Sequence, residues 1–547
     1  MPSSKDTDNA LLAKAHELRR AAVWDEASIH YQRHLRAFPN DLITKHNLSL
    51  CLLAKGDAIG SYELACRVYA EDPSLWQSGL IIAQSLQRLG DRLSAIEWLD
   101  TLRKEFPDIS AVELAWGRLM LQHGGHAEAA RECAQRVAAQ GDQPEAELIG
   151  LAASFYDRPE GQSAKSLSDA IIRWVEHRWY KGGGGAKPKP SVERSTKQKR
   201  LTVRRPRVGL LSPQFHTSPI YFFSFGALSR LQHHWNLVFL DRGSRRDWSR
   251  EAFERIAAEW DIVDSLDSEI LHRRIKSHNF DVLIDMGGWM DAEGLRSLIG
   301  RPAKRQFKWV GGQSATTGLR CFDGFLTDQY QSPLGSESLH SEPLIRMSSG
   351  YVSYTAPTYL PTPSEAPSEA LWQIGLIANP SKLSTSFLIA VSRFLDRWQQ
   401  EQAALGLGLS LYFIDSRYQS KKLQQRIKNF FKKHSIFFIT PSGHRSYLDE
   451  VSKLHAVIDT YPYSGGLTTV EAMMLGVPTF TWKGKLFSER HSSAHNLYAG
   501  FGESDLQVDA LPGDLVRWRK ARPLLDTGSP RLDHDGVANS LLGLMRG

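Results

Sequence analysis

Cysteine is scarce in this chain, and long apolar runs are missing. The four cysteines, Cys51, Cys66, Cys133 and Cys321, are scattered over 547 residues without the close spacing of a metal site. This usage is typical of a reducing compartment with buried thiols. No segment approaches the roughly 18 uninterrupted apolar residues of a membrane span, and the N-terminal stretch lacks the apolar core of a secretory signal. We therefore expect a cytoplasmic protein without a membrane span.

A basic folded surface is also missing, although the net charge is +7. Residues 186–207 hold nine Lys or Arg against one Glu, which leaves the rest of the chain close to neutral. The glycines, prolines and like charges here cannot bury a core, so 181–204 is predicted to be a flexible basic linker. We therefore expect no nucleic-acid partner.

The first third of the chain repeats with a period of 34 residues. Two sets of residues recur with this period. The prolines are Pro39, Pro73 and Pro107, and the glycines are Gly56, Gly90 and Gly124. Small or apolar residues share repeat positions: Ala27, Ala95 and Ala129 at one, and Tyr31, Ala65, Leu99 and Cys133 at another. Two helices per 34 residues resembles tetratricopeptide repeats, about four of them between residues 8 and 158. With a further helix near 166–180, residues 8–180 are expected to form a helical domain that binds extended polypeptide. An irregular helical bundle is the alternative.

From residue 205 the pattern changes to short apolar runs that alternate with helical ones. The first set of expected strands is RVGLLSP, WNLVFLD, DVLIDMGG, RQFKWVGG and GFLTD. The second is IGLIAN, LSLYFID, IFFITP, AVIDTYP and PTFTW. A Pro-rich break at 356–369 separates them. We expect two Rossmann-like α/β domains, residues 205–357 and 368–547, with a cleft between them and ligands at the carboxyl ends of the strands.

One loop of the second set, YPYSGGLTTVEAMMLGVPTF at 461–480, favours an anionic ligand. Gly465 and Gly466 let backbone N–H groups approach a ligand, while Leu467, Thr468 and Thr469 open a helix whose N-terminus attracts phosphate. Glu471, about one turn further, suits the two hydroxyls of a ribose. An ordinary helix capped by threonine is the alternative that this loop alone leaves open.

Together with its neighbours, this loop resembles the nucleotide-sugar loop of the O-linked N-acetylglucosamine transferase family, which includes SPINDLY-like members. The shared run is Asp-Thr-x-Pro-Tyr-x-Gly, then threonines, an acidic residue and Gly-Val-Pro, matched by residues 459–478. Further segments similar to the family are RVGLLSPQFHTSPIYFF, FDVLIDMGGW, RPAKRQFKWVGGQSATTGLRCFDGFLTD, IANPSKLS and SERHSSAHNL. The resemblance covers the whole chain in order: repeats, then two α/β halves.

The resemblance implies a glycosyltransferase of the GT-B type that inverts the anomeric carbon and needs no metal or resident cofactor. A single Asp-x-Asp motif, at 533–535, lies away from any expected strand end. Lys382 and Asn379 would bind the departing diphosphate together with the helix mouth, because without a metal the protein must supply the cations and donors.

Three further residues are implied on the donor side. Tyr447 would stack on the nucleotide base, and Arg490 and His491 are weaker binding candidates. A tyrosine on the core face of a helix, or histidines that merely pack a helix, are the structural alternatives.

The first half departs from the family pattern at two positions. Many relatives carry a histidine immediately before the proline of the first loop, where this chain has Ser218, with His216 two residues earlier. Trp289 also occupies a position that is often His or Tyr. His216 is a candidate acid or base, Ser218 is the residue in the family position, and a side-chain base is dispensable if phosphate oxygens accept the proton.

The opposite lip of the cleft offers four residues that could contact sugar or acceptor: Asp285, Gln313, Thr316 and Thr317. Such residues also end apolar strands for structural reasons.

The expected reaction is transfer of N-acetylglucosamine or a hexose from a UDP-sugar, with UDP-N-acetylglucosamine as the favoured donor, to Ser or Thr of a polypeptide held by the repeats. A GDP-fucose protein O-fucosyltransferase and an Asn-glucosyltransferase are alternatives within the same fold. A catalytically degenerate repeat adaptor is the alternative from another class, favoured by Ser218 and Trp289 and opposed by Lys382 and Glu471. The repeats leave a homodimer open.

Overall fold

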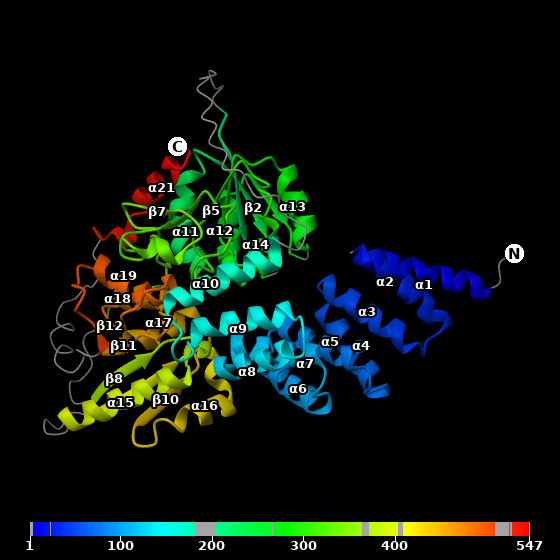
Figure 1. Ribbon diagram of the computed structural model, residues 1–547, viewed down its shortest axis with the longest axis horizontal. Helices are drawn as coiled ribbons and strands as arrows, with labels where there is room; N and C mark the ends of the chain where they lie inside the picture. The colour runs from blue at the N-terminus through cyan, green and yellow to red at the C-terminus, as the bar shows by residue number, and fades with distance from the viewer. Residues whose placement is uncertain are drawn as a thin grey trace. The chain divides into compact units, whose positions relative to one another are not determined.

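The computed structural model describes residues 4–21, 23–180, 204–243, 245–264, 266–363, 371–402, 408–508, 525 and 528–545. The expected linker, 181–204, lies outside the described residues except for its last position. The chain forms two compact units, Met1–Ala153 and Ser154–Gly547, shown by label and colour in Figure 1.

The first unit consists of helices in which each packs against the next. They are α1 (Ser4–Arg20), α2 (Trp24–Ala37), α3 (Leu42–Ala54), α4 (Ala58–Glu71), α5 (Trp76–Arg88), α6 (Arg92–Glu105), α7 (Ser110–Leu119), α8 (Ala127–Ala138) and α9 (Pro144–Tyr156), the last of which crosses into the second unit. Helices α3, α5, α7 and α9 begin 34 residues apart. The helical-repeat architecture is therefore confirmed, with α1 to α8 as four helix pairs.

The turn glycines explain part of this period. Gly56 and Gly90 have φ of 95° and 87°, a left-handed conformation that side chains other than glycine adopt only at a cost. The third turn differs, because the π-helical segment Met120–Gly124 adds a residue and Gly125, not Gly124, has the positive φ of 65°. Helix α8 therefore begins one residue late, and Ala130 is fully buried in place of the expected Ala129, although Cys133 is buried as expected.

The second unit contains two parallel sheets. The first has seven strands in the order β3-β2-β1-β4-β5-β6-β7. Its strands are β1 (Arg207–Ser212), β2 (Asn236–Asp241), β3 (Glu259–Ile262), β4 (Val282–Asp285), β5 (Arg305–Lys308), β6 (Gly324–Thr327) and β7 (Leu344–Arg346). Five were expected; β3 and β7 were not.

The second sheet has five parallel strands in the order β10-β9-β8-β11-β12. These are β8 (Leu371–Leu376), β9 (Gly408–Ile414), β10 (Ser435–Ile439), β11 (Ala456–Ile458) and β12 (Thr479–Phe480), all within or overlapping the expected runs. In both sheets the strand order reverses beside the first strand, as in doubly wound α/β folds. The expected pair of Rossmann-like halves is confirmed.

Helices cover these sheets. In the first half they are α11 (Pro219–Leu231), α12 (Trp248–Ile256), α13 (Ser268–Ser277) and α14 (Ala292–Ser297). In the second half they are α15 (Thr385–Gln402), α16 (Lys421–Lys428), α17 (His444–Ser452), α18 (Leu467–Met474) and α19 (His491–Tyr498). Among the described residues, no helix is both long and apolar enough to cross a membrane.

Two helices lie apart from their expected domains. α10 (Ala164–Val175) belongs to the second unit, where Val175 joins a core cluster of the first half, although 8–180 was expected to be one helical domain. α21 (His534–Gly543) packs against α11, as Figure 1 shows by the red helix beside the green one. The end of the described chain therefore packs with the first half.

Candidate functional site

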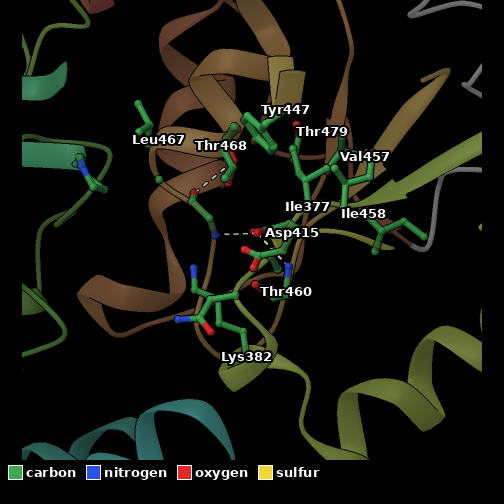
Figure 2. A pocket seen from close by; sticks show the side chains of 18 of the residues that line it. Ile377, Lys382, Asp415, Tyr447, Val457, Ile458, Thr460, Leu467, Thr468 and Thr479 are labelled. Atoms are coloured by element: carbon green, nitrogen blue, oxygen red, sulfur yellow. Dashed lines mark hydrogen bonds between the residues drawn. The ribbon is translucent and has the colours of Figure 1, made fainter. Parts of the chain in front are cut away.

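A cavity of about 210 Å³ lies where the order of the second sheet reverses, between the ends of β8 and β11. Residues that follow β8 (Ala378, Asn379), residues that follow β11 (Asp459, Thr460) and the first turn of α18 line it. Figure 2 shows Lys382 at one end of this cavity and Tyr447 at the other, with Thr468 near the tyrosine. Parallel α/β sheets place ligands at this position.

Asp459, which the sequence analysis did not select, fixes the loop before α18. Its carboxylate accepts hydrogen bonds from the amide of Gly465 (2.6 Å), the hydroxyl of Ser464 (2.6 Å) and the hydroxyl of Thr481 (2.8 Å). The side chain is 4% exposed, and burial raises the pKa of this carboxyl above its ordinary value. The carboxylate therefore organises the loop and is not free to bind a ligand.

The N-terminus of α18 faces the cavity without a side-chain cap from the described residues. Its first amides, from Gly466 to Thr469, have no acceptor one turn earlier in the helix, and the helix dipole adds partial positive charge. A Cβ on Gly465 would lie 2.7 Å from the hydroxyl of Thr468, whereas one on Gly466 would meet nothing closer than 3.7 Å. The bare backbone is thus required by packing at Gly465 only.

The two threonines have different surroundings. Thr468 lines the cavity and is partly exposed. The hydroxyl of Thr469 lies 2.6 Å from that of Ser492 and donates to the carbonyl of Gly465 at 3.1 Å, and the side chain is 1% exposed. Thr469 therefore holds α18 against α19, and only its backbone amide is left for a ligand.

Lys382, at the end of the short helix Pro380–Lys382, supplies a cation to the cavity. Its ammonium donates to the carbonyl of Ser464 (2.9 Å) and lies 4.6 Å from the ring centre of Tyr463. Burial lowers the pKa of Lys382 to about 8, opposed by nearby Asp459. Asn379 caps the same short helix through its side-chain oxygen, which leaves its amide nitrogen as a donor.

A second cation, Arg417, was missed by the sequence analysis. It lines the cavity just beyond β9 and is held by Asp415, whose two carboxylate oxygens accept from the guanidinium at 2.7 and 2.5 Å. The sequence signal was weak, because an Asp-Ser-Arg run after a strand is common in surface turns. The pair orients a guanidinium that carries further N–H donors.

Tyr447 lies at the far end of the cavity, whereas Glu471 is buried behind the α18 N-terminus and does not line it. Glu471 is 1% exposed and lies 2.7 Å from the imidazole of His444, and burial raises its pKa. Tyr447 lines the cavity, and its ring stacks against that of His444 at 5.9 Å. Their roles toward ribose and base stay predictions.

Arg490 and His491 lie beside the loop and do not line the cavity. Arg490 donates to the carbonyls of Tyr330 and Gly484, and so ties the two halves together. His491 packs its ring near Tyr463 and Phe487, and burial lowers its pKa to about 3, so the imidazole is neutral.

In the first half, the loop between β1 and α11 approaches the cavity through Pro219. Ser218 is 7% exposed and donates its hydroxyl to the carbonyl of Gln214 at 2.9 Å. His216 has its Nδ1 3.2 Å from the carbonyl of Thr217, and burial lowers its pKa. A proton on Nδ1 would leave Nε2 as a base.

The four residues that were expected to contact sugar or acceptor from the first half are buried and hydrogen-bonded within the protein. Asp285 accepts from the amides of Gly287 and Gly288 and pairs with fully buried Lys308 at 3.1 Å. The amide of Gln313 donates to the carbonyl of Leu326. Their contact with sugar or acceptor stays a prediction.

Thr316 and Thr317 donate their hydroxyls to the buried carboxylate of Glu342. Trp289, one of the two departures from the family pattern, donates to the carbonyl of Thr316 at 3.0 Å and stacks on Trp179. An aromatic residue at this position therefore joins the first half to the segment that follows α10.

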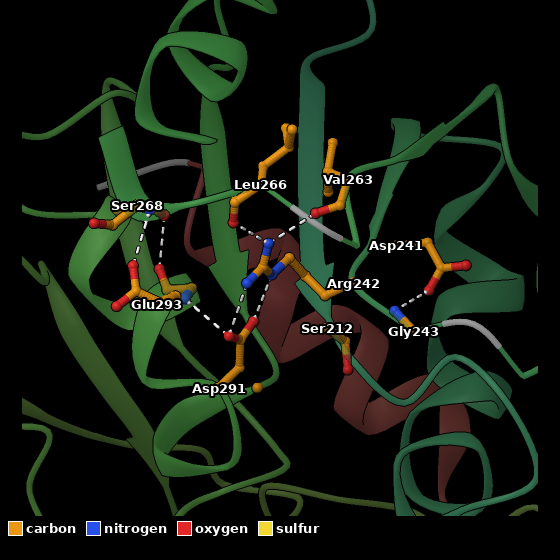
Figure 3. Close-up of polar contacts among 12 residues, drawn as sticks. Ser212, Asp241, Arg242, Gly243, Val263, Leu266, Ser268, Asp291 and Glu293 are labelled. Atoms are coloured by element: carbon orange, nitrogen blue, oxygen red, sulfur yellow. Dashed lines mark hydrogen bonds and ion pairs between the residues drawn. The ribbon is translucent and has the colours of Figure 1, made fainter. Parts of the chain in front are cut away.

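Loops at the carboxyl edge of the first sheet are tied by an arginine. Figure 3 shows the guanidinium of Arg242 between the carboxylate of Asp291 and the carbonyls of Val263 and Leu266. The Arg242 and Asp291 side chains are only 7% and 12% exposed. This pair fixes the loops after β2 and β4 against each other. Within the described ranges, no three His, Cys, Asp or Glu side chains gather as a metal site would require.

Comparison with known proteins finds relatives for about half of the chain. It is 23% identical over 298 residues to the tomato (Solanum lycopersicum) "Probable UDP-N-acetylglucosamine--peptide N-acetylglucosaminyltransferase SPINDLY", and 24% identical over 303 residues to the Arabidopsis thaliana protein of that name. The match covers 53% of this chain in both cases, but only 31% and 32% of the relatives' lengths. No family model matches the chain.

A solved structure matches along the whole chain. A mutant of the Thermobaculum terrenum O-GlcNAc transferase superposes with a TM-score of 0.62 at 20% sequence identity, over 100% of this chain and 98% of that one. This likeness shows the fold, helical repeats followed by a GT-B pair of Rossmann-like halves. The resemblance expected from the sequence is thereby confirmed.

Proposed function

We propose that this protein is a glycosyltransferase that moves N-acetylglucosamine or a hexose from a UDP-sugar to Ser or Thr of a polypeptide. One observation carries the proposal: Lys382, Arg417 and the uncapped N-terminus of α18 converge on one cavity at the switch point of the second sheet. Cations and backbone donors in a closed space are what a leaving nucleoside diphosphate needs. The curated relatives bear names that describe transfer of N-acetylglucosamine from UDP-N-acetylglucosamine to a peptide, which supports this class of reaction.

The chain's own residues divide the work of a metal-independent, inverting transfer. Lys382, protonated below its pKa of about 8, would neutralise the charge that grows on the departing phosphate, and Asn379 and the amides of Gly466 to Thr468 would orient it. Tyr447 would stack on the base, and Glu471 would bind the ribose after its hydrogen bond from His444 rearranges.

His216 is the better of the two candidate bases. Its lowered pKa keeps the imidazole neutral at pH 7, as a general base must be. The hydroxyl of Ser218 already donates a hydrogen bond to the carbonyl of Gln214, and a serine is no base at neutral pH. A His216→Ala variant with full activity would leave the phosphate oxygens as the proton acceptor.

The helical repeats would hold the acceptor. A cavity of about 540 Å³ within the first unit is lined by Trp24 and by the polar side chains of Arg19, Gln84, Gln87 and Arg88. Amides and guanidinium groups bind the carbonyls of an extended polypeptide, and the aromatic ring adds apolar contact. A cytoplasmic location and a homodimer stay predictions.

Calorimetric titration with UDP and GDP, without and with Mg²⁺, tests the proposal. We expect wild-type protein to bind UDP equally well with and without Mg²⁺, and Lys382→Ala to bind at least tenfold more weakly. Lys432→Ala is the matched control, because Lys432 is an exposed lysine away from the cavity. A lack of UDP binding by the wild type would overturn the proposal.

Transfer assays then separate the alternatives. Incubation of UDP-N-acetylglucosamine with peptides that differ only in Ser, Thr or Asn identifies the acceptor by mass. A preference for GDP would favour the fucosyltransferase alternative, and an absence of binding to either nucleotide would favour the repeat adaptor.

A further inference from the structure

A second cavity of about 840 Å³ lies in the second unit, on the other side of the loop that forms the nucleotide cavity. Three segments border it: the turn before α10 with the start of that helix, residues 333–339 after β6, and residues 483–490 after β12. Tyr461 also lines it, one residue from Thr460 of the first cavity. The two cavities therefore share the 460–461 stretch as a wall.

Positive charge dominates this second cavity. Five cationic side chains line it and only one carboxylate, that of Glu489. The cations are Arg158, Lys165, Lys483, Lys485 and Arg490. A concave wall that carries one sign of charge raises the local concentration of the opposite charge.

The single carboxylate is already satisfied. Glu489 is 2% exposed, accepts from the amides of Lys485 (2.7 Å) and Leu486 (2.9 Å), and forms an ion pair with Arg158. Lys165 pairs with Asp169 on its own helix.

Two lysines remain available. Lys483 and Lys485 are exposed, and no carboxylate in the described part of the chain forms an ion pair with either. Arg490 is different, because it donates hydrogen bonds to neutral carbonyls and interacts electrostatically with Glu503, Asp328 and Glu489. The cavity therefore has cationic groups without counter-charges.

The size and rim of the cavity fit a peptide better than a single ion. A volume of about 840 Å³ lies in the range of sites that hold organic ligands. Its rim includes Leu334, which is 89% exposed, and its neighbour Pro333. Apolar contact beside ammonium groups suits a chain that carries both aliphatic and carboxylate side chains.

We propose that this cavity binds an acidic segment of a polypeptide partner. Such a segment, anchored by Lys483 and Lys485, would lie one loop away from the nucleotide cavity. The idea that this segment flanks the modified residue of an acceptor rests on the proposed transferase function. The idea that the cavity binds such a segment does not. Acceptors with Asp or Glu beside the modified residue would thus be preferred.

Fluorescence anisotropy with labelled peptides tests this proposal in the absence of nucleotide. The probe is a twelve-residue peptide with four Glu and two Leu, and its twin has Gln at the four Glu positions. We expect the acidic peptide to bind at least tenfold more tightly than the twin at low salt, and the difference to shrink as salt screens the charges.

Two variants with equal change of net charge locate the site. Lys483→Glu with Lys485→Glu should lose at least tenfold in affinity for the acidic peptide and keep wild-type UDP binding. Lys432→Glu with Lys433→Glu, at exposed lysines away from both cavities, should bind like the wild type. Equal losses in both variants, or equal binding of the two peptides, would overturn the proposal.

Inorganic phosphate serves as a competitor. Weak competition, only at concentrations that also raise ionic strength substantially, supports a peptide site. Full displacement by low millimolar phosphate would show an ion site and would also overturn the proposal. If the wild-type protein does not bind UDP, that result counts against the proposed transferase function and not against this peptide site.

Discussion

The pKa of Lys382 predicts how nucleotide affinity varies with pH. In the free protein burial lowers this pKa to about 8, and a diphosphate binds the protonated ammonium. Affinity should therefore fall as pH rises from 7 through 8 to 9. About 90% of the lysine is protonated at pH 7 and about 10% at pH 9, so the affinity for UDP should fall about tenfold, or about 1.4 kcal/mol.

Three other groups near the cavity, His491, Tyr447 and Tyr463, do not titrate in this window. Burial raises the pKa of Asp459 above its ordinary 3.8 and lowers that of His491 to about 3, and it raises the pKa values of Tyr447 and Tyr463 above the ordinary 10. Asp415 and Arg417 form an ion pair beside the cavity.

Calorimetric titration with UDP from pH 6.5 to 9.5 measures the profile. Lys382→Arg is the control, because a guanidinium stays protonated throughout, and its affinity should be independent of pH. A flat profile for the wild type, or an equal fall in the arginine variant, would refute the assignment of Lys382 to the phosphates.

Three further changes probe the same architecture. Gly465→Ala should weaken UDP binding at least tenfold, because its Cβ would lie 2.7 Å from a threonine hydroxyl, whereas Gly466→Ala has room and should bind within about threefold of wild type in the same titration. Arg417→Ala should weaken UDP binding by ten- to a hundredfold, because a cation is lost and the Asp415 carboxylate is left facing the phosphates; unchanged affinity would exclude Arg417 from the site. Arg531→Ala should lower the free energy of unfolding, measured with denaturant, by about 3–5 kcal/mol, because its fully buried partner Asp328 loses its counter-charge. A decrease of less than about 1 kcal/mol would contradict that reasoning.

Much of the fold could be predicted because it depends on local patterns. The 34-residue spacing of prolines and glycines locates the helix pairs, and buried parallel strands such as RVGLLS are continuous apolar runs. β3 was missed because it lies at a sheet edge, where alternate residues face water, and EWDI has no apolar run. The extra residue before Gly125 was missed because one added residue in a turn leaves the spacing of the neighbouring prolines and glycines almost unchanged.

The site was only partly predictable for a different reason. Lys382 and the residues at the N-terminus of α18 follow closely after strands in the sequence, so the order of strands and loops along the chain is enough to identify them. Arg417 and Asp459 act through partners that the fold brings together, and the sequence does not show which carboxylate will be buried under a loop. The burial of Thr316 and Thr317 around Glu342 was hidden in the same way, because Glu342 comes 25 residues after Thr317.

The return of α21 to α11 has a consequence for synthesis on the ribosome. The second half is in effect an insertion into the first, since Val537 and Leu541 of α21 complete the core that Leu228 and Leu231 begin. Chains emerge from their N-terminus and domains usually fold in that order. Here part of the apolar surface of α11 stays uncovered until the whole second half has been made. A chaperone that shields α11 during this interval would raise the yield of folded protein more than one that acts on the finished chain.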